Sequence, residues 1–175
     1  ISLLADRVEG NLLACAQEIE KLRLLQGAGP VDADEVAAAV TDNARFDVFT
    51  LVDSALQGGA ARSNRILAGL RAEGVEPVLV LWALAREVRT VAAMARDVAG
   101  GGRAERVLAQ HRVWDSRKPV LKAALGRHSV ATWQSLLREC AGIDRVIKGQ
   151  APGNPWDELV QLTLWIAGHP PVPVH

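Results

Sequence analysis

The apolar residues of this chain recur with a period close to 3.6, and no segment shows the apolar–polar alternation of a β-strand. Alanine and leucine, which favour helices, dominate the sequence, and hydrophobic residues make up 49% of its 175 residues. A chain of this length and composition can bury a sizeable core. The sequence therefore predicts an all-α fold.

Glycine and proline mark where the predicted helices begin and end in the second part of the chain. Gly58 and Gly59 end the first of them, Gly74 ends the next (residues 60–73), and Pro77 stands in the first turn of a third helix, expected to be the most buried. Two short helices, a long helix from Ser129 and a closing helix (residues 156–167) follow. The helix that ends at Gly58 has an apolar stripe of Phe46, Phe49, Val52 and Leu56. The stripe of the long helix comprises Trp133, Leu136, Leu137, Cys140, Ile143 and Ile147.

A domain boundary is predicted near residues 41–45. Before it, Asp32 followed by Glu35 has the capping-box spacing and indicates a short helix that stops there, and a new helical hairpin begins after it. Since the chain begins at Ile1, without methionine and inside an amphipathic run, we expect a fragment of a longer protein. The two domains would be residues 1–43 and 44–175.

Several classes of function find no support in the residues. The 20 basic and 20 acidic residues balance, so any contact with nucleic acid must be local, and no apolar run is long enough to span a membrane. Cys15 and Cys140 lie on separate apolar stripes and read as core residues. No nucleophile has its partners, and no phosphate-loop or zinc motif occurs. We expect no catalytic residue, no metal and no cofactor.

One segment is locally basic and holds a tryptophan away from any helical stripe. Residues 103–128 contain seven Lys or Arg against two acids, and Trp114 lies among Arg112, Arg117 and Lys118. Cations that neutralise phosphate beside an aromatic face are what single-stranded nucleic acid binds. The alternative is structural: Asp115 caps the following helix, Trp114 packs on Pro119, and the cations are only solvated. Both interpretations stay open, and we expect Trp114 to combine the two roles, with its edge packed at the helix start and one face open to a base.

Other tryptophans lie on the apolar helical stripes. With Leu162, Leu164 and Ile166, they supply more apolar surface than a small domain needs to bury, and some are candidates for a contact with another chain. The alternative is that they all belong to the core. The candidates for this subunit interface are Trp82, Trp156, Leu162 and Trp165.

Four segments, EGNLLACAQEIEKLRLL (9–25), ARFDVFTLVDSAL (44–56), LRAEGVEPVLVLWALAREVR (70–89) and HRVWDSRKPVLKAALGR (111–127), resemble the delta-subunit family of the bacterial DNA polymerase III clamp loader. The resemblance implies the end of a small helical AAA+-like lid (1–43) followed by a helical collar (44–175). It implies an N-terminal domain, missing here, that grips and opens the sliding clamp. Leu13 stands where ATP-hydrolysing relatives have an arginine that reaches phosphate, and leucine cannot pair with phosphate. The family therefore implies a cytoplasmic, non-ATPase subunit.

The resemblance also implies partners and site residues. The partners are the clamp-loader ATPase (gamma/tau), the delta-prime subunit and primer–template DNA. Trp114 is similar to the aromatic residue that meets the template strand inside the collar. A second aromatic residue of the family has no counterpart here, where Ala151 stands, and Lys148 is expected to touch phosphate instead. A free-standing helical DNA-binding regulator is the alternative, and a helical enzyme is a more distant one.

Overall fold

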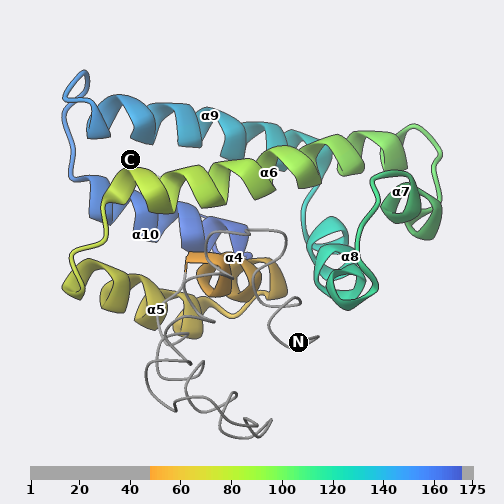
Figure 1. Ribbon diagram of the computed structural model, residues 1–175. Helices are drawn as coiled ribbons and strands as arrows, with labels where there is room; N and C mark the ends of the chain where they lie inside the picture. The colour runs from red at the N-terminus through yellow and green to blue at the C-terminus, as the bar shows by residue number, and fades with distance from the viewer. Residues whose placement is uncertain (1–47, 171–175) are drawn as a thin grey trace, which may run out of the picture. The chain divides into compact units, whose positions relative to one another are not determined.

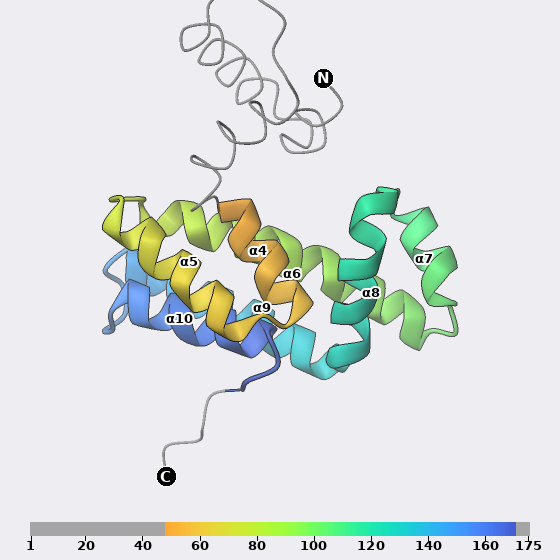
Figure 2. The same ribbon diagram turned by 90° about the horizontal axis from the view of Figure 1, so that it is seen from below.

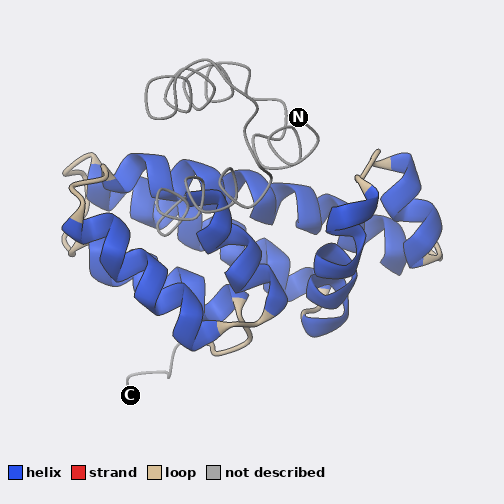
Figure 3. Cartoon of the chain, turned by 60° about the horizontal axis from the view of Figure 1, so that its bottom comes forward, coloured by secondary structure: helices blue, strands red, loops and turns tan. Residues whose placement is uncertain are grey.

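The computed structural model describes residues 48–170, which form seven α-helices and one short 3-10 helix, with no strand in that range (Figures 1 and 3). The predicted all-α fold is confirmed. In chain order the elements are α4 (Val48–Gln57), α5 (Ala60–Ala72), α6 (Pro77–Ala99), α7 (Ala104–Gln110), η2 (Asp115–Arg117), α8 (Lys118–Arg127), α9 (Val130–Ile147) and α10 (Pro155–Ile166).

The chain divides after Arg45 into two units, and the described residues belong to the second. The predicted capping box of Asp32 and Glu35, the role of Leu13 and the place of Cys15 lie outside the described residues. The assignment of residues 1–43 to a lid and of 44–175 to a collar stays a prediction.

The helix α6 is the longest of the described elements and forms the centre of their packing. Its neighbour α9 runs beside it, and α4, α7, α8 and α10 also contact it (Figure 1). On one side α5 packs against α4 and α10, and α8 packs against α4 and α6 (Figure 2). The turn at Gly100–Gly102 returns the chain so that α7 lies against α6. As predicted, α6 is the central helix, and its ten buried residues are more than any other described helix has, although a larger fraction of the shorter α4 is buried.

The core lies where the apolar faces of α4, α6, α9 and α10 meet. On α9 the predicted stripe is correct: Trp133, Leu136, Cys140 and Ile143 are buried, and the flanking Leu137 and Ile147 are half-buried. On α4 the predicted face is partly wrong, because Leu51 and Ala55 are buried with Val52 and Leu56, whereas Phe49 is only half-buried. The reason is that α4 packs against α5, α6 and α8 together, so its buried arc is wider than a single stripe.

Polar groups complete several helix ends. The Ser129 hydroxyl accepts a hydrogen bond from the Thr132 N–H (3.1 Å), and the Asn154 side-chain oxygen accepts one from the Trp156 N–H (3.0 Å), which caps α9 and α10. At the other ends, the Arg127 guanidinium donates to the carbonyls of Leu56 (2.7 Å) and Ile166 (3.4 Å). Arg127 thus joins the C-terminal ends of α4 and α10, and its burial lowers its pKa.

None of the helices within residues 48–170 combines the length and the apolar character needed to cross a lipid bilayer.

Candidate nucleic-acid and subunit interfaces

Trp114 lies in the connection between α7 and α8 and is the most exposed tryptophan of the chain, at 69% of its surface. This confirms the prediction that it is the tryptophan most open to solvent. With so much of the ring exposed, any packing against Pro119 covers only a minor part of it. An exposed indole presents a flat face on which an unpaired base can stack.

The backbone on both sides of Trp114 is tied to the neighbouring helices. Before it, the Val113 N–H donates to the Leu108 carbonyl (3.0 Å), and Val113 packs against the core. After it, the Trp114 carbonyl accepts hydrogen bonds from the N–H groups of Arg117 (3.0 Å) and Lys118 (3.2 Å). The exposed ring therefore projects from a fixed segment of chain.

Arg112 has a left-handed backbone, with φ of 54°, and is the one non-glycine residue in the described range with a positive φ. Such a conformation is uncommon for a residue with a β-carbon and costs free energy. It reverses the chain just after α7, two residues before Trp114. No salt bridge to Arg112 or to Arg106 is found within residues 48–170, so these two exposed guanidinium groups remain open to phosphate.

The cap by Asp115 that the structural alternative required is not formed. No side chain caps η2 or α8, and the Asp115 carboxylate accepts a hydrogen bond from Lys118 Nζ instead. That hydrogen bond and the lysine charge lower the pKa of Asp115. The physical reason is that the turn closes on the Trp114 carbonyl, which leaves the Asp115 side chain in solvent beside Lys118.

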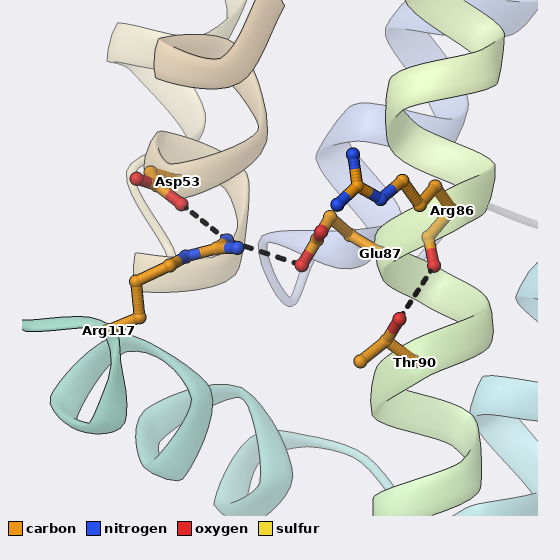
Figure 4. Close-up of polar contacts among 5 residues, drawn as sticks. All are labelled: Asp53, Arg86, Glu87, Thr90 and Arg117. Atoms are coloured by element: carbon orange, nitrogen blue, oxygen red, sulfur yellow. Dashed lines mark hydrogen bonds and ion pairs between the residues drawn. The ribbon is translucent and has the colours of Figure 1, made fainter. Parts of the chain in front are cut away.

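The basic side chains predicted to bind phosphate, apart from Arg112, are paired with carboxylates of the same chain. Arg117 Nη2 lies 2.8 Å from Asp53 Oδ1 and 3.2 Å from Glu87 Oε2 (Figure 4). Lys118 pairs with Asp115, and Lys148 Nζ lies 2.6 Å from Asp144 Oδ2. Lys122 Nζ likewise lies 2.7 Å from Glu105 Oε1, and this hydrogen bond lowers the pKa of Glu105. Asp115 and Glu105 already belong to the two acids counted in residues 103–128, so it is the pairing of Arg117 with Asp53 and Glu87 that lowers the local excess of positive charge further.

Lys148 is not brought together with Trp114. It follows the last turn of α9, whereas α8, which starts just after Trp114, leads into the first turn of α9 (Figure 1). The 18 residues of α9 span about 27 Å at 1.5 Å per residue. A phosphate contact of Lys148 would lie well away from a base stacked on Trp114.

Asp53 and Glu87 are functional candidates that sequence reasoning missed. They lie on α4 and α6, and 64 and 30 residues separate them from Arg117. One signal was present: Glu87 is an acid on the helix that was expected to be the most buried, and a buried acid requires a partner. Nothing in the sequence identified that partner.

Apolar side chains remain exposed on the first turns of α6. Val78, Leu79 and Trp82 are 46%, 53% and 55% exposed, and we call this group the α6 apolar surface. The Arg86 guanidinium carbon lies 5.7 Å from the centre of the Trp82 ring, a cation–π contact that holds the ring at the surface.

The other predicted interface residues are less accessible. Trp156 and Trp165 are half-buried and pack against the core. Leu162 is fully buried, so its assignment to a subunit interface is wrong. The reason is that α10 contacts α4, α5, α6 and α9, and Leu162 faces this packing.

Over the described part of the chain, no three His, Cys, Asp or Glu side chains gather closely enough to hold a metal ion.

Comparison with known proteins identifies a matching family and two relatives. The family described as "Processivity clamp loader gamma complex DNA pol III C-term" matches residues 48–173. The DNA polymerase III subunit delta of Escherichia coli is 35% identical over 162 residues, which are 93% of this chain and 47% of that protein. The subunit of the same name from Haemophilus influenzae is 30% identical over 174 residues, 95% of this chain and 51% of that protein. The chain thus spans about half the length of these curated relatives.

Proposed function

The chain belongs to the family of the C-terminal part of the DNA polymerase III delta subunit, and from this premise we propose that it is a collar for assembly of a clamp loader. Its proposed partners are the clamp-loader ATPase (gamma/tau) and the delta-prime subunit, in the cytoplasm. A sliding clamp would be reached only through an N-terminal domain outside this chain. The collar itself would have no catalytic activity.

The observation that carries the assembly proposal is the α6 apolar surface. The described helices already enclose a core, yet Val78, Leu79 and Trp82 stay about half exposed side by side on one helix. Contiguous apolar groups of this kind mark sites of protein association, and tryptophan is enriched among residues that contribute most to binding. We therefore assign this surface to a contact with a neighbouring subunit.

The test is to mix the chain with the clamp-loader ATPase subunit from the same source and to measure the mass by light scattering after size exclusion. A defined mixed complex is expected. Trp82→Ser should weaken it by about 2 kcal/mol, roughly thirtyfold in Kd, because tryptophans in such contacts contribute on that scale. Trp114→Ser is the matched control, since it removes another exposed tryptophan, on a different part of the surface. Separate peaks for the unmodified chain, or equal losses in both variants, would contradict the proposal.

A second function, contact with primer–template DNA, rests on the exposure of Trp114. Its indole is 69% exposed between two tied stretches of backbone, with the exposed arginines Arg106 and Arg112 close to it in sequence. Stacking of a base on an aromatic side chain contributes about 1–3 kcal/mol, and the arginines supply charge for the neighbouring phosphates. We propose that Trp114 stacks on an unpaired template base in the assembled loader.

In the assembled loader, Trp114→Ala should weaken primer–template binding about tenfold without unfolding the chain, whereas Trp114→Phe should retain most of the affinity because a ring remains. Fluorescence anisotropy with labelled primer–template measures both. Lys148→Ala is expected to change the affinity little. If Trp114→Ala left the affinity for primer–template DNA unchanged, the proposed contact of Trp114 with DNA would be wrong.

The same two assays, light scattering and fluorescence anisotropy, distinguish a collar from a free-standing DNA-binding regulator. A regulator would bind DNA without partners and form a symmetric dimer. A collar would bind DNA poorly alone and associate with a different chain.

A further inference from the structure

We propose that Arg117 is a positioning residue: its ion pairs with Asp53 and Glu87 hold in place the turn that presents Trp114. Arg117 would then support DNA binding through the protein itself, without touching phosphate. This inference rests on the proposed contact of Trp114 with DNA. It also replaces the role that the sequence predicted for Arg117.

The ion pairs join three elements that are distant in sequence. A single guanidinium nitrogen, Arg117 Nη2, donates to Asp53 Oδ1 on α4 (2.8 Å) and to Glu87 Oε2 on α6 (3.2 Å), and Figure 4 shows it between the two carboxylates. The side chains of Arg117 and Glu87 are only 19% and 12% exposed, and that of Asp53 is 38% exposed. Because the contact is largely shielded from water, salt screens it less than a surface ion pair.

Arg117 is also the residue that closes the turn on Trp114. Its backbone N–H donates to the Trp114 carbonyl (3.0 Å), so one residue is bonded to Trp114 through its backbone and to α4 and α6 through its side chain. On the other side, Val113 is held to α7 and to the core. Without the ion pairs, the segment after Trp114 would lose its side-chain link to α4 and α6.

The charges of the cluster oppose a direct phosphate contact. Among the described residues, two carboxylates lie against this one cation, and their negative charge opposes the approach of a phosphate. If Arg117 turned toward DNA, it would leave Glu87 buried without this partner, and an unpaired buried carboxylate is strongly unfavourable. Arg106 and Arg112 meet no such obstacle, since no salt bridge to either is found in the described range.

The deciding experiment is Asp53→Asn in the assembled loader, because the two roles of Arg117 predict opposite signs. If Arg117 bound phosphate, removing a competing carboxylate would leave Arg117 less tightly held by the protein and would tighten primer–template binding. The positioning role predicts binding about fivefold weaker, although the protein has become more positive, because the stacking of Trp114 is impaired. The matched control is Asp144→Asn, which frees Lys148 from its own pair and should not weaken binding. Equal or tighter binding by Asp53→Asn overturns the proposal.

The salt dependence of the affinity for primer–template DNA provides an independent test. Arg117→Gln should lower the affinity but leave the slope of log affinity against log salt unchanged. Loss of a phosphate contact would instead reduce that slope by about 1. A reduced slope therefore overturns the positioning role.

A measurement without DNA separates failure of this inference from failure of the proposed function. In the chain labelled with 5-fluorotryptophan, the ¹⁹F resonance of Trp114 is assigned by its loss in Trp114→Phe. This resonance should move or broaden in Asp53→Asn. It should also do so in Glu87→Gln, which keeps the shape of the side chain and serves as the second variant if Asp53→Asn folds poorly. An unchanged resonance overturns the inference. If Trp114→Ala binds DNA normally while the resonance still responds, the DNA contact fails but the positioning of Trp114 stands.

Discussion

At the scale of single residues, Cys140 shows how burial controls reactivity. It lies on the inner face of α9, and burial raises the pKa of its thiol from 9.0 to about 11. The thiolate is the reactive form of cysteine, and a shift of this size lowers its fraction about a hundredfold at mildly alkaline pH. The native chain should therefore keep this thiol protonated.

We predict that iodoacetamide modifies Cys140 far more slowly in the native chain than in denaturant at about pH 8. Mass spectrometry of a Cys15→Ser variant, in which Cys140 is the remaining cysteine, measures both rates. Equal rates would mean that the inner face of α9 opens freely to solvent.

Sequence reasoning predicted the buried stripe of α9 and the exposure of Trp114, but not which apolar or charged side chains meet a partner. Trp114 stood outside every apolar stripe, so its exposure could be inferred. Leu162 stood on a stripe, and a stripe looks the same whether it faces a core or a partner chain. Arg117 was predicted to bind phosphate, with a solvated cation as the alternative, because its carboxylate partners lie on helices whose packing the sequence does not specify.

At the scale of elements, the N-terminal end of α9 depends on one hydroxyl. Ser129 accepts a hydrogen bond from the Thr132 N–H, which has no partner within the helix. We predict that Ser129→Ala lowers the free energy of unfolding by about 1 kcal/mol and that Ser129→Gly costs less. Urea denaturation followed by circular dichroism measures both. Gln134→Ala, an exposed substitution on the same helix, is the control and should be nearly neutral.

Helix boundaries were predictable where glycine, proline or a capping residue marks them. The observed ends of α5, α9 and α10 lie within about a residue of the predicted ones, since Gly74, Ser129 and Pro155 stand at them. The start of α8 was not predicted. There a 3-10 turn closes on a backbone carbonyl, and backbone hydrogen bonds of this kind leave no mark on residue type.

At the scale of the whole molecule, stability should be distributed unevenly among the helices. The centre of α6 and α9 is formed by fully buried residues such as Val88, Val91 and Leu136, whereas α7 buries only Val107 and Leu108. Local opening is easiest where few apolar groups are buried. The pairing of α6 with α9 itself was not predictable, because periodicity identifies an apolar face but not the face that packs against it.

We predict that native-state hydrogen exchange ranks the helices in this order. Amides of α7 should exchange fastest through local opening, and those in the middle of α6 and α9 should exchange only through global unfolding. Mass spectrometry of peptides from each helix gives the comparison. Protection of α7 equal to that of α6 would contradict the ranking.

The α6 apolar surface has a consequence for the life of this polypeptide before assembly. In the free chain of these 175 residues, Val78, Leu79 and Trp82 are open to solvent, and the 20 basic and 20 acidic residues give this part no net charge to keep copies apart near neutral pH. Copies made in excess of their partner would therefore tend to adhere to one another or to chaperones. If the proposed subunit contact forms on this surface, a balanced supply of this chain and its partner would matter for solubility as well as for the composition of the complex.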